Sequence, residues 1–258
     1  MNRYYTNFNK YKDLLIELIK KDIQLKYKNS YLGVLWSFIN PLLMMVILTI
    51  VFSELFKNNI ANFPVYVLTG RMIYSFFSES TNFAMNSIVN NNQLIRKVYV
   101  PKYFFPLSKV CSSFITSLIS LIPVFLVMLF TGMEFSVYNL FLFVPLFLLL
   151  IICMGIGLLL STIFVFFRDM GHLYSVILLI LMYMTPIFYP EEIIPKRFQW
   201  LIEINPMYPV LQMLRDLLIN NQMFSLYEFL ISIFYALVYF SLGLLVFYKK
   251  QDRFIYHL

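Results

Sequence analysis

The chain has 258 residues, of which 60% are hydrophobic and only 13% are charged. A water-soluble globule of this size cannot bury so large an apolar fraction, so lipid must cover much of the chain. The net charge of +7 is compatible with nucleic-acid binding, but the Lys and Arg residues gather at the ends of apolar runs, a pattern typical of membrane orientation. We therefore predict an all-α integral membrane protein, formed as one domain over residues 1–258, that contacts membrane lipid and binds no nucleic acid.

Residues 1–32 are predicted to form a cytoplasmic arm that ends in an amphipathic helix. Between Tyr11 and Lys28, apolar side chains recur at three- and four-residue spacing; they are Tyr11, Leu14, Leu15, Leu18 and Ile19. The charged residues lie mostly on the other side of this helix; they are Lys12, Asp13, Glu17, Lys20 and Lys21. An ordinary soluble helix would show the same pattern, but this segment leads directly into a long apolar run, which favours a helix lying along the membrane surface.

Six membrane spans are predicted, because the chain contains six apolar runs near the roughly 20 residues needed to cross a bilayer. They lie near residues 33–56, 63–83, 107–131, 138–167, 172–189 and 226–248. The fourth run is long enough to tilt or to project from the bilayer, and the fifth is barely long enough to cross it. Pro41, Pro123, Pro145 and Pro186 fall inside these runs, and each is expected to kink or end a helix. The preceding arm lacks the pattern of a cleavable secretory signal, so the first span is expected to act as its own insertion signal.

The basic residues in the connections predict the orientation. Six spans place both termini on the same side of the membrane. That side carries fifteen Lys and Arg residues, whereas the opposite side carries four, which are Lys57, Lys196, Arg197 and Arg215. We therefore predict a multi-pass protein of the cytoplasmic (inner) membrane with both termini in the cytoplasm.

The connection between the fifth and sixth spans is too long and too apolar for a plain loop. It contains Trp200, Leu201 and Ile202, and then a periodic apolar set formed by Val210, Leu211, Leu214, Leu217 and Leu218. Asn205-Pro206 separates the two groups and is a strong helix breaker. Two short helices are expected here, dipping into or resting on the outer leaflet.

The sequence offers little that could catalyse a reaction. It has no G-x-x-x-x-G-K-[ST] phosphate loop, so ATP hydrolysis by that route is expected on another chain. Cys111, Cys153, His172 and His257 show no metal-ligand spacing, and neither a metal nor a cofactor is predicted. Glu191-Glu192 could act in acid–base chemistry, but adjacent carboxylates at a helix start are more typical of a solvated cap. The small residues Cys153, Gly155 and Gly157 of the fourth span indicate close helix packing.

Two ionisable residues lie within the second span. Arg71 and Glu79 are functional candidates, because charged groups at membrane depth usually face the interior of a helix bundle or a water-filled cavity. The alternative interpretation places Glu79 in solvent near the cytoplasmic end of the span and lets Arg71 reach the outer interface.

The loop after the second span has the composition of a docking segment. Leu94 and Ile95 lie between three consecutive Asn residues and the basic pair Arg96-Lys97. Two adjacent large apolar residues gain nothing in an exposed loop, but each would contribute roughly 1.5 to 3 kcal/mol if a partner buried it. We therefore predict that this loop presses into a groove of a partner protein.

The order of these features resembles the permease subunits of polysaccharide-exporting ATP-binding cassette transporters, in the type-two exporter class. The matching segments extend over nearly the whole chain; they are residues 26–36, Asn40-Pro41, 92–101, 106–108, Phe167-Arg168-Asp169, 185–190 and 205–215. Arg71 departs from the pattern, because an apolar residue is expected there.

The resemblance implies a homodimer of this chain docked on two copies of a separate ATP-binding cassette ATPase. It also implies a lipid-linked polysaccharide substrate, of the O-antigen, capsule or teichoic acid type. The residues expected to couple the permease to the ATPase are Leu94, Ile95, Arg96, Lys97, Arg168 and Asp169. The possible transport path is assigned to Trp36, Arg71, Tyr183, Phe188 and Tyr189, since aromatic faces can stack against sugars without tight polar contacts.

Three other functions are compatible with parts of the pattern. A related permease could export a drug or a simple lipid. A membrane enzyme acting on a lipid-linked sugar would need clustered carboxylates, histidines or a metal motif, which the sequence lacks. A purely structural membrane scaffold would not need the basic docking loop.

Overall fold

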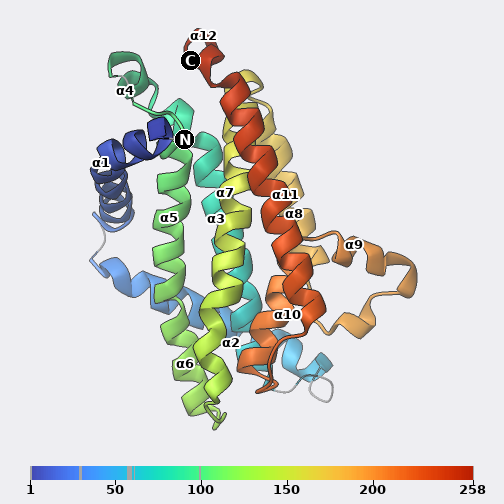
Figure 1. The fold of residues 1–258 in the computed structure, drawn as a ribbon. Coiled ribbons are helices and arrows are strands. Elements are labelled where there is room, and N and C mark those ends of the chain that lie inside the picture. Colours follow the sequence, from blue (N-terminus) through green and yellow to red (C-terminus); the bar gives the residue numbers. More distant parts are fainter. Residues whose placement is uncertain (1, 29–30, 57–59, 61, 99, 258) are drawn as a thin grey trace.

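The computed structural model describes residues 2–28, 31–56, 60, 62–98 and 100–257, and the regular elements in these ranges are helices. The longer helices are α1 (Asn2–Tyr27), α2 (Trp36–Phe56), α3 (Phe63–Asn90), α5 (Phe104–Ile119), α6 (Leu121–Phe130), α7 (Phe143–Phe166), α8 (Met170–Met184), α10 (Met207–Leu218) and α11 (Leu226–Lys250). The short ones are α4 (Asn92–Lys97), α9 (Gln199–Glu203) and α12 (Phe254–His257). In Figure 1, both termini and α4 lie at one end of a helix bundle, and α6 and α10 lie towards the other.

Apolar length supports several of the predicted spans. Within the part of the chain that the structure describes, the helical stretches long and apolar enough to cross a membrane are Phe104–Phe130, Val137–Phe166 and Leu226–His257. Trp36–Phe52 and Met170–Met184 are apolar but shorter. The predicted number of six spans therefore stays a prediction, with α3 as the long helix that carries two charged residues.

Prolines explain where the third and fifth predicted spans differ from the helices. The third begins earlier than expected, at Phe104, and is divided at Ser120 into α5 and α6. Pro123 lacks an N–H and its ring would clash with the carbonyl of Ile119, the last residue of α5. The fifth span was predicted to reach Tyr189, but α8 ends at Met184, because a residue that precedes a proline avoids helical geometry.

The fourth span also begins differently. A 3-10 turn over Val137–Leu142 precedes α7. Pro145 is the third residue of α7, where its missing N–H leaves no helical bond unmade. Pro145 therefore lies in the first turn of α7 and does not interrupt the helix. The predicted run of 138–167 consists of a 3-10 turn followed by α7.

Close packing of α7 against α11 confirms the interpretation of the small residues. A Cβ added to Gly155 would overlap the backbone of Tyr239 and Phe240, and one added to Gly243 would overlap the backbone of Gly155. On the other side of α7, a Cβ on Gly157 would come within 2.8 Å of the Cβ of Ala84 on α3. Glycine therefore lets α7 approach two neighbours at backbone distance.

α3 lies inside the bundle, with α5, α7, α8 and α10 packed around it. Two of its polar residues form hydrogen bonds with α8. The Tyr174 hydroxyl of α8 donates to Thr81 Oγ1 at 2.6 Å, and the Tyr74 hydroxyl of α3 donates to the Leu178 carbonyl at 3.0 Å. Thus the least apolar span is shielded from lipid mainly by protein.

The amphipathic helix packs against its own chain. α1 begins at Asn2, earlier than the predicted Tyr11. Leu18 is buried in a cluster with Phe104 and Phe105 of α5, and Tyr11 and Leu14 pack against the edge of that cluster. Its apolar face is thus covered at least partly by protein, and contact with the membrane surface stays a prediction.

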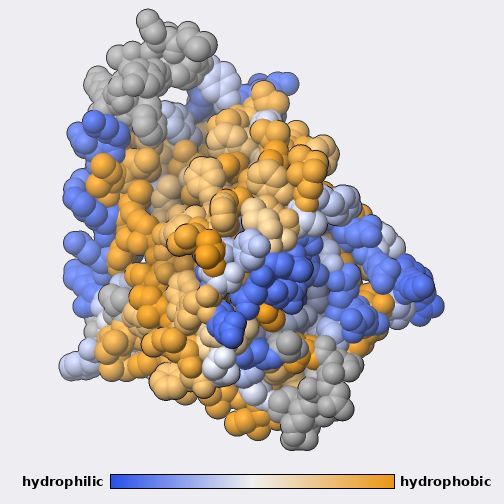
Figure 2. All heavy atoms as spheres, turned by 60° about the horizontal axis from the view of Figure 1, so that its bottom comes forward, coloured by the Kyte–Doolittle hydropathy of each residue, from blue (hydrophilic) through white to orange (hydrophobic). Residues whose placement is uncertain are grey.

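In the segment before α11, α10 lies towards the end of the bundle opposite the termini, whereas the α9 region projects from the side of the bundle (Figure 1). We call α10 and the break at Asn205-Pro206 before it the cap. α9 and α10 flank Asn205-Pro206, as the sequence indicates. The periodic apolar set of α10 is completely buried against α3, α7 and α11, so α10 does not rest on the leaflet through these side chains. Figure 2, which shows this end of the molecule, has a broad hydrophobic surface interrupted by a hydrophilic area on one side.

Candidate functional site

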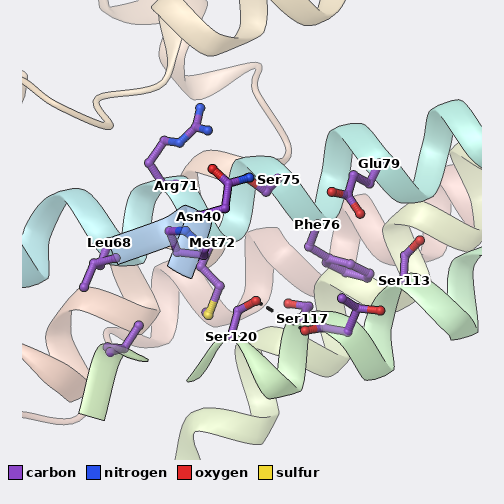
Figure 3. Close-up of a pocket in the computed structure, with 13 residues that line it drawn as sticks. Asn40, Leu68, Arg71, Met72, Ser75, Phe76, Glu79, Ser113, Ser117 and Ser120 are labelled. Carbon is purple, nitrogen blue, oxygen red and sulfur yellow. Dashed lines mark hydrogen bonds between the residues drawn. The ribbon is translucent and has the colours of Figure 1, made fainter. Parts of the chain in front are cut away.

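A polar cavity lies between α2, α3, α5 and α6 (Figure 3). Its volume is about 80 Å³, well above the roughly 10 to 15 Å³ that one water needs. Its polar lining comes from three helices and the break after α5; these residues are Asn40, Arg71, Ser75, Glu79, Ser113, Thr116, Ser117 and Ser120. The arrangement provides a polar surface inside the helix bundle, beside the predicted span that the sequence singles out.

The hydroxyl groups of α5 lie in a column because they are spaced by about one helical turn. Ser112, Thr116 and Ser120 each donate to a carbonyl one turn earlier, at 2.9, 3.1 and 3.3 Å. Their donor groups are thus satisfied within the helix, and their lone pairs remain for the cavity. The Ser117 hydroxyl is buried without a hydrogen-bond partner among the described residues.

The two charged residues of α3 do not pair with each other. Figure 3 shows the Arg71 guanidinium pointing away from Ser117 and Ser120. Arg71 is partly buried and has no ion pair with any described residue. Glu79 follows two turns later, roughly 12 Å along the helix. The pair therefore marks two separate places along the cavity.

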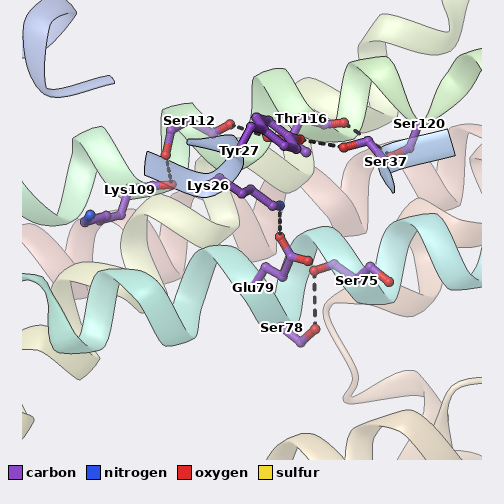
Figure 4. A network of polar contacts seen from close by, with 10 residues as sticks. All are labelled: Lys26, Tyr27, Ser37, Ser75, Ser78, Glu79, Lys109, Ser112, Thr116 and Ser120. Carbon is purple, nitrogen blue, oxygen red and sulfur yellow. Dashed lines mark hydrogen bonds and ion pairs between the residues drawn. The ribbon is translucent and has the colours of Figure 1, made fainter. Parts of the chain in front are cut away.

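Glu79 instead binds the end of α1 (Figure 4). Lys26 Nζ lies 2.8 Å from Glu79 Oε2, and Lys109 Nζ of α5 lies 2.6 Å from Asp22 Oδ1. Glu79 is therefore ion-paired, but its side chain is 44% exposed, so the alternative interpretation of a solvated group is not contradicted. Sequence reasoning missed both pairs, because the partners are far apart along the chain and no local spacing connects them.

The docking loop is α4, and only half of its apolar pair is available to a partner. Leu94 is 37% exposed, whereas Ile95 is 7% exposed and packs with Phe104 and Phe254 of its own chain. The prediction that both side chains form an exposed knob is thus wrong for Ile95, since a one-turn helix turns adjacent residues to different sides. Arg96 and Lys97 are exposed.

The predicted pair Arg168-Asp169 lies at the same end of the molecule. Both side chains are exposed in the connection between α7 and α8. The Arg168 guanidinium lies 5.4 Å from the Phe164 ring and donates to the His257 carbonyl at 3.5 Å. α4, this connection and α12 therefore form one surface next to the termini (Figure 1).

Lys102, which lies just before α5, connects this surface to the C-terminal segment. Its ammonium donates to the Gln251 carbonyl at 2.7 Å and lies 5.8 Å from the ring of Phe254. Partial burial lowers the pKa of Lys102 from its ordinary value, and the charge of Asp252 opposes this effect.

Three of the predicted path residues meet near the end of α8 at Met184, together with one that was missed. The Phe188 ring stacks on Phe52 of α2 with a centroid distance of 5.7 Å, and it meets Tyr183 and Tyr189 edge-on at 6.3 and 5.9 Å. We call Phe52, Tyr183, Phe188 and Tyr189 the aromatic group. Phe52 carried no sequence signal of its own, since Phe is common in lipid-facing helices.

Trp36 does not join the aromatic group. It is the first residue of α2, and Phe52 follows 16 residues later, roughly 24 Å along the helix at about 1.5 Å per residue. Arg71 has no ring contact with the group either, among the described residues. Trp36 therefore lies apart from the aromatic group, whereas Arg71 follows Gly70, which packs on Ile187 next to Phe188.

Arg215 is a further residue that the sequence reasoning misplaced. It was counted as an exposed outer cation, but its side chain is 5% exposed within the cap. The guanidinium lies 3.4 Å from the centre of the Tyr66 ring and donates to the Pro186 carbonyl at 2.6 Å. The signal was present, because position 215 falls on the apolar face of α10 with Leu211 and Leu218.

These features are those of a multi-pass membrane permease: helices apolar enough to span a bilayer, a cavity with polar side chains between them, and one end that exposes charged side chains. Residues 13–219 match the family model described as "ABC-2 type transporter". The chain belongs to the ABC-2 type transporter family, as a permease of the inner membrane and not an enzyme, with ATP hydrolysis on a separate subunit.

Named relatives are similar over most of their length. The chain is 34% identical to an O-antigen export system permease protein, RfbA, of Klebsiella pneumoniae, over 94% of this chain and 93% of the relative. It is 30% identical to an RfbA permease of Myxococcus xanthus over 80% of each chain. It is 25% identical to the polysialic acid transport protein KpsM of Escherichia coli, over 77% and 78%.

Proposed function

We propose that this chain is the permease subunit of an ATP-driven exporter that moves a lipid-linked polysaccharide outward across the cytoplasmic membrane. The observation that carries the proposal is the similarity to O-antigen export permeases over nearly the full length of both chains. The aromatic group supports it, because flat aromatic faces can stack on sugar rings and release them again. The polymer class extends to O-antigen, capsule or teichoic acid chains.

The proposed transporter contains two copies of this chain and two copies of a separate ATPase. Exposed apolar side chains along α2 and α8, such as Leu43, Ile47, Val176 and Ile180, supply surfaces that lipid or a second permease could cover. The surface formed by α4, the α7–α8 connection and α12 is the proposed site of ATPase docking, with Leu94, Arg96, Lys97, Arg168 and Asp169 as exposed contacts.

The proposed orientation places this docking surface and both termini in the cytoplasm, which the excess of basic residues supports. Single cysteines at positions 97 and 197 test it, because Lys97 and Arg197 are both exposed. In intact cells, a membrane-impermeant thiol reagent should label position 197 and not position 97. The opposite labelling pattern would contradict the orientation.

Export is tested by reconstitution in vesicles with the partner ATPase. ATP should drive a lipid-linked polysaccharide across the bilayer, and omission of either subunit should abolish transport. If a drug or a simple phospholipid moved at the same rate while the polysaccharide did not, the related function of drug or lipid export would replace this proposal. Transport without ATP or partner would exclude both.

A further inference from the structure

The turn over Thr185–Pro190 joins the end of α8 to the cap, and buried groups hold its backbone. Arg215 of α10 donates to the Pro186 carbonyl at 2.6 Å. The Tyr66 hydroxyl of α3 donates to the same carbonyl at 3.2 Å and to the Tyr189 carbonyl at 2.9 Å. The carbonyls of Pro186 and Tyr189, on either side of Ile187-Phe188, are therefore held by side chains from other helices.

Neighbouring contacts leave the turn little freedom to shift. Ile187 packs so closely on α3 that a Cβ on Gly70 would come within 3.0 Å of its Cα. Asn205, at the break between α9 and α10, donates from Nδ2 to Thr185 Oγ1 at 2.7 Å. The turn thus follows α3 on one side and the cap on the other.

The charge of Arg215 is held in an unusual way. No carboxylate among the described residues lies within ion-pair distance of it, and the cation is balanced by carbonyl oxygens and by the face of the Tyr66 ring. Burying a guanidinium without a carboxylate at ion-pair distance is costly. This cost points to a role other than stability.

The Phe188 side chain is what the turn presents. Its ring lies face to face with Phe52, at an interplanar angle of 18°. Pro186 and Tyr189, the residues whose carbonyls are held, bracket Phe188 in sequence. A displacement of Arg215 or Tyr66 is therefore expected to shift the backbone that carries Phe188.

We propose that Arg215 and Tyr66 are positioning residues, which hold Phe188 on Phe52 and transmit movements of the cap to the aromatic group. The assignment of sugar as the molecule that contacts the aromatic group rests on the proposed function. The clamp itself, formed by Arg215 and Tyr66 on the Pro186 and Tyr189 carbonyls, does not.

Cross-linking measures the clamp without reference to any substrate. Cysteines replace Phe52 and Phe188 in a chain that lacks Cys111 and Cys153, and disulfide formation is followed in the purified permease. Losing a hydrogen bond from a charged group should lower cross-linking by about tenfold in Arg215→Gln. Arg215→Lys should retain only part of the cross-linking, because an ammonium lacks the planar guanidinium that stacks on the Tyr66 ring.

Two further variants keep the result interpretable. Tyr66→Phe retains the ring and its stacking on Arg215 but removes both hydroxyl bonds, so it should fold and still reduce cross-linking several-fold. Arg197→Gln is the matched control, because Arg197 lies 4.7 Å from the Phe198 ring on the exposed surface and touches none of the aromatic group. It should leave cross-linking unchanged.

Export then shows whether the clamp acts through the aromatic group. Arg215→Gln should reduce transport in the wild-type background and have little further effect beside Phe188→Ala, whereas independent roles would give multiplied losses. Unchanged cross-linking in folded Tyr66→Phe and Arg215→Lys would overturn the clamp. If these variants lose cross-linking but the wild-type permease moves no polysaccharide, the clamp would be supported and the proposed function rejected.

Discussion

Lys26 and Glu79 are 53 positions apart in the sequence, yet their charged groups lie 2.8 Å apart and join the end of α1 to the middle of α3. A second pair, Lys109 with Asp22, joins α1 to α5. The first pair is 33% and 44% exposed and the second 25% and 11%. The two pairs should therefore contribute differently to stability, although both bind the same helix.

We expect Lys109→Met to destabilise the protein more than Lys26→Met. Without Lys109, the Asp22 carboxylate is left without its cation, and its Oδ2 atom is already buried without a partner; the expected cost is about 1 to 3 kcal/mol. A half-exposed pair such as Lys26–Glu79 contributes about 1 kcal/mol or less. Thermal unfolding in detergent measures both. Equal losses, or a larger loss for Lys26→Met, would contradict the ranking.

Leu94→Asp should weaken ATPase docking by about tenfold or more, since burying this side chain in a partner contributes roughly 1.5 to 3 kcal/mol. Ile95→Asp is a different experiment, because Ile95 belongs to the permease core and its replacement should destabilise the permease itself. Co-purification with the ATPase, at equal amounts of folded permease, separates the two effects. Full co-purification of Leu94→Asp with normal export would mean that α4 is a solvated connector.

Gly155→Val should be among the most damaging single changes in the spans. The new side chain would overlap the backbone of α11, and backbone cannot move aside as a flexible side chain can, so a loss of roughly 3 kcal/mol or more is expected. Gly171→Ala is the control, because its Cβ would meet only the edge of the Phe164 ring at 3.2 Å. Size-exclusion profiles and thermal unfolding compare them. Similar stability for the two variants would show that α7 and α11 can separate without cost.

Arg71→Leu should reduce polysaccharide export while folding and ATPase binding stay intact, because a partly buried cation beside a cavity with polar side chains is expected to face the transport path. Arg71→Lys should retain part of the activity. The measurement is transport at equal protein level in vesicles. Unchanged transport in Arg71→Leu would leave only the interpretation that this side chain reaches the membrane interface.

Periodicity and helix breakers predicted most of the helices, because both act locally. The break at Asn205-Pro206 and the end of α8 before Pro186 follow from backbone geometry that a sequence displays directly. The division of the third span at Ser120 has the same cause, and Pro123 indicated it within the continuous hydrophobicity of 107–131. An apolar run indicates where lipid can be, and says little about whether the helix within it is continuous.

The candidate site was less predictable, because burial depends on contacts between distant segments. Ile95 and Arg215 were both assigned to exposed connections, and both are covered by helices that follow or precede them by many residues. Composition marked Arg71 and Glu79 as exceptional without indicating that Glu79 would find Lys26. Charges in a membrane protein signal that a partner is needed, but only the fold identifies it.

The central place of α3 has a consequence for how the protein is made. On its own, this helix would insert poorly into the bilayer, since an arginine near the middle of a span costs about 2.5 to 3.5 kcal/mol to insert. Most of the helices that shield it, α5, α7, α8 and α10, are synthesised after it. Nascent α3 should therefore linger at the insertion machinery, exposed to quality-control proteases, until its later neighbours emerge from the ribosome and enclose it.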